Sequence, residues 1–131
     1  MGINKYYLVP FSRQAVFEAW VSPETVIPPV TKVEIDPRVG GSLKLLVESP
    51  DSTSTMTGKF KVVEPLEKLV YTWEWDKSGE FTTATVTLNE TEKGTKININ
   101  HSGFSHEKSR FTHDARWDSY VEGMVQLLAK T

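Results

Sequence analysis

Hydrophobic and polar positions repeat with two different periods along this chain of 131 residues. Between Val30 and Phe104 the period is two, which is typical of strands that have one dry face. Short polar segments separate the successive runs, at 49–54, 64–68, 76–80 and 90–94. Connections of this length are too short for parallel crossovers, so the pattern predicts a series of antiparallel strands.

Before this region, the pattern predicts one strand and two short helices. The strand is expected at 3–9, where β-forming residues dominate. Ser12 is placed to cap a helix over 13–21, in which apolar residues recur at helical spacing. Ser22 is expected to begin a second short helix with a proline in its first turn, and the proline pair at 28–29 ends it.

After the strand region, helical spacing returns over 106–130, with Ser105 as the expected N-cap. Apolar residues form a broad stripe along this helix: Phe111, Trp117, Tyr120, Val121, Met124, Leu127 and Leu128. This is the only predicted element long enough to cover the dry face of the sheet. We therefore predict one α+β domain over residues 1–131, with seven antiparallel strands packed against a long C-terminal helix.

Composition and charge narrow the classes of function. The chain has 38% hydrophobic and 24% charged residues, which is ordinary for a globular domain. A net charge of −2 provides no basic field for nucleic acid or for an anionic membrane surface, so we expect neither as a partner. There is no cysteine, which excludes disulfides and thiolate nucleophiles. The first residues lack the pattern of a secretory signal, and we expect a cytoplasmic monomer or weak homodimer.

The segment "IDPRVGG" (35–41) has the glycines of a phosphate-binding loop but not its context. Such loops lead into a helix, whose N-terminus faces the phosphate. Here the glycine pair leads into an alternating stretch that predicts a strand, and no Lys-Ser/Thr follows. We interpret the segment as a corner with positive φ at glycine, in which Arg38 pairs with Asp36.

Five blocks of sequence resemble a known family, in the same order: "VFEAW" (16–20), "EIDPRVGGSLKL" (34–45), "LEKLVYTWEW" (66–75), "HSGF" (101–104) and "RW" (116–117). They are similar to homologues of the activator of heat-shock-protein-90 ATPase, within the START-like or birch-pollen-allergen-like superfamily. The resemblance implies a helix-grip fold, in which a curved antiparallel sheet wraps around the C-terminal helix. It also implies an apolar cavity between sheet and helix, which in this superfamily often holds lipids, sterols or polyketides.

The chain departs from the family at "IPPV" (27–30), where many relatives have a pair of tryptophans. In the family's fold this segment lies near the mouth of the cavity. We therefore expect the substitution by Ile and Pro to reshape the entrance, which weakens any analogy with the ligands of relatives.

The candidate ligand-binding residues share a predicted position between sheet and long helix: Tyr71, Trp73, Trp75, His101, Phe104, Trp117, Tyr120 and Met124. Aromatic walls with few polar groups are typical of binding pockets, but the same residues also suit plain core packing. His101 ends a dry face, where it is either a general base or a histidine hydrogen-bonded to a neighbour such as Tyr or Ser.

No motif predicts a metal, a cofactor or a catalytic constellation. His106, Glu107, His113 and Asp114 are close in sequence, but they lack the His-Glu-x-x-His spacing of zinc proteases. Ser, His and Asp are all present, yet no nucleophile-elbow motif holds them.

Three functions are compatible with these observations. The first is a non-catalytic module that binds a small apolar molecule. The second is a co-chaperone acting on a heat-shock-protein-90 homologue, which the resemblance implies. Because this chain begins at the first predicted strand, without the family's separate chaperone-binding domain, we expect direct stimulation of the chaperone to be weak or absent. The third is a cyclase- or hydrolase-like enzyme that uses His101 inside the cavity.

Overall fold

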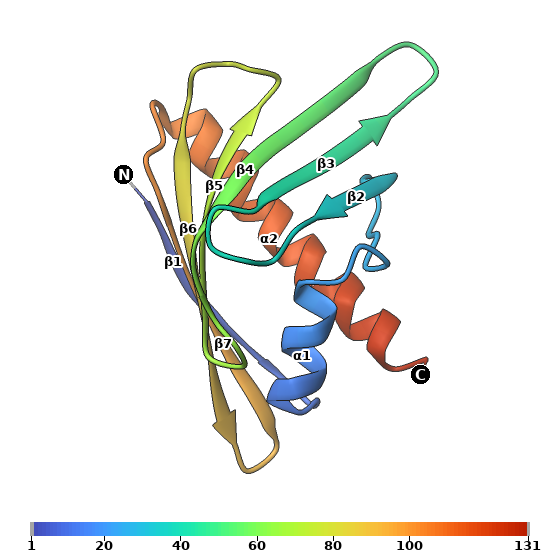
Figure 1. The fold of residues 1–131 in the computed structure, drawn as a ribbon, viewed down its shortest axis with the longest axis vertical. Coiled ribbons are helices and arrows are strands. Elements are labelled where there is room, and N and C mark those ends of the chain that lie inside the picture. The colour runs from blue at the N-terminus through green and yellow to red at the C-terminus, as the bar shows by residue number, and fades with distance from the viewer. Residues whose placement is uncertain (1, 131) are drawn as a thin grey trace.

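The computed structural model describes residues 2–130 (Figure 1). Its strands are β1 (Gly2–Val9), β2 (Lys32–Ile35), β3 (Ser42–Glu48), β4 (Thr53–Glu64), β5 (Lys68–Trp75), β6 (Thr82–Thr91) and β7 (Gly94–Ser102). Its helices are α1 (Arg13–Trp20) and α2 (Glu107–Leu128). The strands form one antiparallel sheet in the order β1-β7-β6-β5-β4-β3-β2. The predicted α+β class and the seven-stranded antiparallel sheet are confirmed.

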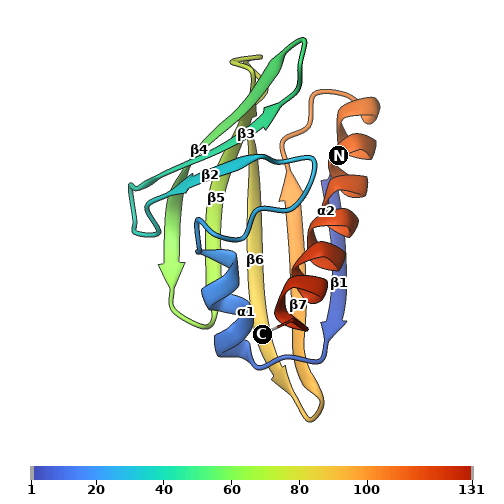
Figure 2. The same cartoon turned by 90° about the vertical axis from the view of Figure 1, so that its right-hand side faces the viewer.

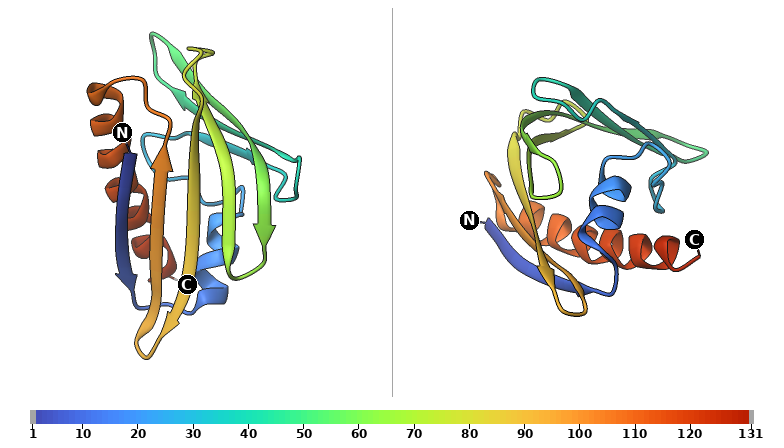
Figure 3. Two further views of the ribbon diagram at one scale, coloured as in Figure 1. Left: turned by 90° about the vertical axis from the view of Figure 1, so that its left-hand side faces the viewer. Right: turned by 60° about the horizontal axis from the view of Figure 1, so that its bottom comes forward.

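The sheet is strongly curved, and both helices lie on its concave side (Figures 2 and 3). Two features of β4 bend it where the two halves of the sheet meet. The pairing of β4 with β5 shifts register between Phe60 and Val62, and such a bulge kinks a strand. Gly58 lets β4 and β5 approach each other closely, because a Cβ at this position would lie 1.8 Å from the carbonyl oxygen of Thr72.

The backbones of the helices come close to only one half of the curved sheet. Helix α2 approaches β1, and α1 approaches β6, β7 and α2. Among the described residues, no Cα of either helix lies within 8 Å of a Cα in β2, β3, β4 or β5. Figure 2 shows the consequence, with β2, β3 and β4 curving away from α2. The helix-grip arrangement is therefore tight on one side and open on the other.

A charged cluster holds α2 against the edge strand β1. The Lys5 ammonium lies 2.9 Å from an Asp114 carboxylate oxygen and 2.7 Å from an oxygen of Asp118. The Tyr7 hydroxyl donates to the same Asp118 oxygen at 2.5 Å. Because Asp114 and Asp118 are one helical turn apart, the cluster fixes the direction of the helix as well as its distance from the sheet.

A second polar cluster fixes the start of α2 and corrects the predicted cap. Ser105 is not the N-cap, because its backbone N–H and its hydroxyl both donate to Glu80, at 2.8 and 2.6 Å. His106 takes the cap position, and its Nδ1 accepts from the backbone N–H of Ser109 at 3.3 Å. The Ser109 hydroxyl also donates to Glu80, at 2.5 Å. The loop between β5 and β6 is thus tied to the first turn of the helix.

The helix predicted from Ser22 does not form. The segment between α1 and β2 consists of turns, in which the N–H of Thr25 donates to the Ser22 carbonyl and the N–H of Val30 to that of Ile27. Prolines at 28 and 29 supply no backbone donors, so a helix there has too few hydrogen bonds to propagate. The first short helix is confirmed, with the Ser12 hydroxyl accepting from Ala15 N–H at 3.1 Å.

The glycine corner has the predicted character. The Arg38 Nε donates to the Asp36 carboxylate at 2.8 Å, and Gly40 has a φ of +83°. The chain then enters β3 rather than a helix.

No helix in the described part of the chain is long and apolar enough to cross a membrane.

Candidate functional site

The uncovered half of the sheet carries a row of apolar side chains across four strands. Val33 in β2 pairs with Leu45 in β3, Leu45 pairs with Met56 in β4, and Met56 pairs with Trp75 in β5. Residues that are directly opposite in neighbouring strands point to the same face of a sheet. This face is concave here, and α2 does not close over it.

A cavity of about 530 Å³ fills this space. The sheet contributes residues that alternation places on its concave face: Val33, Ile35, Leu43, Leu45, Val47, Ser54, Met56, Phe60, Tyr71, Trp73 and Trp75. Helix α2 contributes one side of its surface: Phe111, Thr112, Ala115, Arg116, Trp117, Ser119 and Tyr120. The remaining wall comes from Trp20 and from the segment between α1 and β2, at Ser22, Thr25 and residues 27–30.

Five of the eight predicted binding residues line this cavity: Tyr71, Trp73, Trp75, Trp117 and Tyr120. The rings of Tyr71 and Trp73 stack with centroids 6.0 Å apart. The Tyr71 hydroxyl accepts a hydrogen bond from the Trp20 indole N–H at 3.1 Å. Burial raises the pKa of both Tyr71 and Tyr120, so these hydroxyls stay neutral at physiological pH.

The other three predicted residues, His101, Phe104 and Met124, are buried but do not line the cavity. His101 is completely buried, and both of its ring nitrogens are engaged. The Trp117 indole donates to Nδ1 at 3.0 Å, and Nε2 lies 2.8 Å from the Thr82 hydroxyl. Burial, with a smaller contribution from the neighbouring His113, lowers the pKa of His101 to about 3. A histidine in this state has no free nitrogen to take a proton from a molecule in the cavity.

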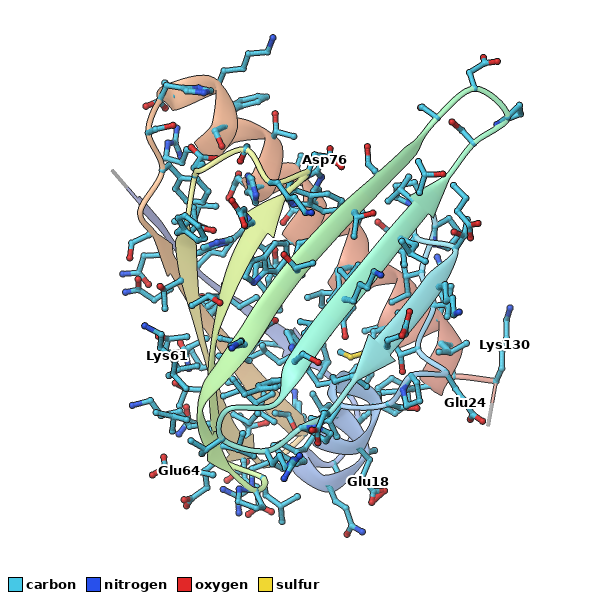
Figure 4. All side chains as sticks on the ribbon, turned by 45° about the horizontal axis from the view of Figure 1, so that its top comes forward. Glu18, Glu24, Lys61, Glu64, Asp76 and Lys130 are labelled. Carbon is cyan, nitrogen blue, oxygen red and sulfur yellow. The ribbon has the colours of Figure 1, made fainter. Side chains whose placement is uncertain are left out.

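Arg116 contributes the only charge among the lining residues, and the sequence reasoning did not select it. Its guanidinium carbon lies 4.3 Å from the centroid of the Trp75 ring. Desolvation lowers the pKa of Arg116, and Asp76 opposes that effect. Figure 4 shows Asp76 at the end of β5, where its carboxylate accepts from the Thr55 backbone N–H at 2.8 Å. One signal was available, since Arg116 immediately precedes Trp117 and lies beside the apolar stripe of the helix.

The departure from the family at 27–30 lies in the cavity wall. Ile27 is buried, while Pro28 and Pro29 are exposed, so this segment reaches from the interior to the surface. Phe111 of α2 also lines the cavity and is 70% exposed. These residues therefore form the edge of the cavity that faces solvent.

Gly123 in α2 lets this segment approach the helix. A Cβ at position 123 would lie 2.4 Å from Cγ2 of Ile27. Glycine inside a helix costs roughly 1 kcal/mol relative to alanine, and this contact gives a structural reason for the glycine.

No cluster of three or more potential metal ligands occurs in residues 2–130.

Comparison with known protein families assigns the chain to one of them. A family model described as Activator of Hsp90 ATPase homolog 1-like protein matches residues 10–129. The chain belongs to this family. Membership, together with the observed sheet and long C-terminal helix, confirms the START-like helix-grip fold that the five sequence blocks predicted. No curated protein matches the chain in sequence.

Solved structures share the fold at low sequence identity. A protein from Mesorhizobium loti is 20% identical, with a TM-score of 0.84 over 100% of this chain and 98% of that chain. A protein from Chromobacterium violaceum is also 20% identical, with a TM-score of 0.84 over 96% of each chain. An AHSA1-like protein from Aeromonas hydrophila is 19% identical, with a TM-score of 0.79 over 99% of this chain and 93% of that chain. At these identities the likeness concerns the fold alone.

Proposed function

We propose that this protein binds a small apolar molecule in the cavity between α2 and strands β2–β5. The observation that carries the proposal is the cavity of about 530 Å³ on the concave face of the sheet. Pockets for small molecules typically have volumes of about 300–1,000 Å³ and mainly apolar walls. An apolar cavity of roughly 150 Å³ is already large enough to hold benzene.

The division of the sheet supports this proposal over plain core packing. Ala84 in β6 is completely buried, and it pairs with Tyr71 on one side and His101 on the other. On the opposite side of β5, the concave-face residues Val33 and Leu45 are only half-buried. Core residues normally pack without voids larger than a water molecule. A wall of half-buried apolar side chains around a large cavity is the arrangement expected of a binding site.

The environment of His101 favours binding over catalysis. A cavity base needs a free nitrogen within hydrogen-bond reach of a ligand. In His101, however, Nδ1 accepts from the Trp117 indole and Nε2 is engaged with the Thr82 hydroxyl, so neither nitrogen is free.

The co-chaperone function is the alternative, and the family description is its support. It is tested by measuring the ATPase rate of the heat-shock-protein-90 homologue from the same organism as the chain is added. A saturable increase in rate supports the alternative, and a rate that does not change with added chain contradicts it.

Direct titration tests the binding proposal. Trp20, Trp73, Trp75 and Trp117 all line the cavity, so occupation is expected to change the intrinsic fluorescence. Octanol serves as an uncharged aliphatic probe and naphthalenemethanol as an uncharged flat one. Because naphthalenemethanol absorbs in the same range as tryptophan, its binding is measured by calorimetry. Saturable binding of either compound to one site supports the proposal. Linear, unsaturated signals with both compounds contradict it.

A further inference from the structure

The polar groups of the cavity wall have an unequal distribution of donors and acceptors. The 25 lining residues include no Asp, Glu, Asn, Gln, His or Lys, and one Arg. No carboxylate lies within the 4.0 Å ion-pair distance of the Arg116 guanidinium in the described structure. The indole N–H groups of Trp73 and Trp75 are also buried in this wall without an acceptor. The unpartnered side-chain groups named here, on Arg116, Trp73 and Trp75, are therefore all donors.

The position of Arg116 makes its charge available to the cavity. The guanidinium carbon lies 4.3 Å from the centroid of the Trp75 ring, a contact that does not use the N–H groups as hydrogen-bond donors. Desolvation lowers the pKa of Arg116 and Asp76 raises it, but the Asp76 carboxylate is already bonded to the Thr55 N–H. The other arginine of α2, Arg110, is differently placed, since it pairs with Glu107 one turn away. Among residues 2–130, Arg116 is thus a cation at the edge of an apolar cavity without an ion-pair partner.

We propose that the cavity selects apolar molecules that carry a single carboxylate, and that Arg116 binds this group. The proposal rests on the proposed binding function and specifies the class of ligand. A planar guanidinium matches a carboxylate with two parallel hydrogen bonds. One cation neutralises one negative charge, whereas a phosphate monoester carries −1.5 to −2 near neutral pH and calls for more. The chain as a whole has a charge of −2, so its overall field does not attract anions, and the selectivity must come from this residue.

Matched pairs of compounds test this inference. Octanoate and octanol have the same chain, as naphthoate and naphthalenemethanol have the same ring system, and in each pair only the acidic compound is charged. Calorimetry at low ionic strength is expected to give about tenfold tighter binding of the carboxylate, which corresponds to about 1.4 kcal/mol. The preference is expected to fall in high salt, because Arg116 is exposed.

Variants assign the preference to one side chain. Arg116→Gln removes the charge while keeping a long side chain, and it is expected to abolish the carboxylate preference and leave alcohol binding within about twofold. Arg116→Lys is expected to keep part of the preference, because lysine retains the positive charge but cannot form the two parallel hydrogen bonds of a planar guanidinium. Arg110→Gln, on the same helix but outside the cavity wall, is the matched control and is expected to change neither affinity.

The outcomes separate this inference from the proposed function. Binding of the alcohols without a preference for carboxylates overturns the inference and leaves the proposed function standing. A preference that survives in Arg116→Gln overturns the role of Arg116. Tighter binding of octyl phosphate than of octanoate, lost in Arg116→Gln, overturns the choice of carboxylate. Absence of any binding overturns the proposed function, and the inference with it.

Discussion

The indole N–H of Trp117 donates to Nδ1 of His101 across 3.0 Å in the buried interior. An indole nitrogen is only a donor, so Nδ1 of His101 carries no proton. The proton of the neutral ring is therefore on Nε2, which donates to the Thr82 hydroxyl at 2.8 Å. This pair of contacts joins α2 to β7 and β6, and it fixes the tautomer of a histidine that has no contact with water.

His101 is expected to stay neutral across the physiological range, which NMR can measure. Its pKa is lowered to about 3, mainly by burial, against an ordinary value of 6.5. The ring signals of His101 are expected to stay constant between pH 8 and about 5, while free imidazole in the same tube titrates. A midpoint for His101 near 6.5 contradicts the buried hydrogen-bonded arrangement.

The same burial predicts how stability depends on pH. Below pH 6.5 the unfolded chain takes up protons on the histidines that the folded chain keeps neutral, so the free energy of unfolding falls as the pH falls. For His101 this loss is about 1.4 kcal/mol per pH unit between its unfolded pKa and its much lower folded pKa. The pKa of His113 is also lowered by burial, and it adds to the effect. Denaturant midpoints at pH 7.5, 6.5 and 5.5 measure this loss, and equal midpoints contradict it.

Glu80 is expected to stabilise the protein through its carboxylate. Burial alone raises its pKa, but hydrogen bonds from Ser105 and Ser109 outweigh burial and lower it to about 2, from an ordinary 4.5. The stabilisation is therefore complete above pH 4.5 and is lost as the pH falls toward 2. Glu80→Gln is expected to destabilise the protein at pH 7, and the difference from the wild type should narrow between pH 4.5 and 2. Glu24→Gln, in an exposed position, is the control.

A difference in unfolding free energy between the wild type and Glu80→Gln that does not change with pH contradicts stabilisation by the carboxylate. It indicates that Glu80 acts through shape or through neutral hydrogen bonds rather than through its charge.

The sequence pattern was sufficient for most of the fold. Period-two alternation gave the strands because one face of the sheet is dry, and Ser12 marked the start of α1. The helix expected from Ser22 failed because a cap and an N1 proline are weak local signals when two further prolines follow. The N-cap of α2 was displaced by one residue because Ser105 bonds Glu80, which is 25 positions away in sequence. Local patterns carry no information about such a partner.

Only part of the candidate site could be predicted from the sequence. Tyr71, Trp73 and Trp75, which line the cavity, could be selected from the sequence because aromatic alternation is visible in one strand. Val33 and Leu45 were not selected, since ordinary aliphatic residues on a dry face look the same whether a helix packs on them or not. Which half of the sheet stays uncovered depends on the curvature at β4 and on where α2 crosses, and neither is contained in the period of the sequence.

Overpacking is expected to distinguish the two halves of the sheet. Ala84→Leu inserts a large side chain into the closed half and is expected to cost about 1–3 kcal/mol of unfolding free energy. Leu45→Phe adds volume on the cavity side and is expected to cost well under about 1 kcal/mol, because the space is empty. Denaturant midpoints of both variants provide the comparison. Equal costs at the two positions contradict an open cavity.

Gly123 is expected to couple to Ile27 at the cavity edge. Alanine in a helix is favoured over glycine by roughly 1 kcal/mol, but its Cβ would lie 2.4 Å from Ile27 Cγ2. Gly123→Ala is therefore expected to give no gain in stability in the wild type and a gain of roughly 1 kcal/mol in an Ile27→Ala background. The double-mutant cycle measures this coupling. A coupling near zero contradicts the packing of segment 27–30 against α2.

The space beside β3 is expected to hold a ligand, and substitutions at two adjacent positions of that strand test this. Leu45 faces the cavity, whereas Leu46 is on the opposite face of the same strand and is not part of the wall. Octanol is titrated into the wild type, Leu45→Phe and Leu46→Phe, and its dissociation constant is measured by fluorescence. The account predicts saturable binding to the wild type and Leu46→Phe with similar affinity, and a loss of about tenfold or more in Leu45→Phe. Equal affinities in all three proteins, or no saturable binding to the wild type, contradict it.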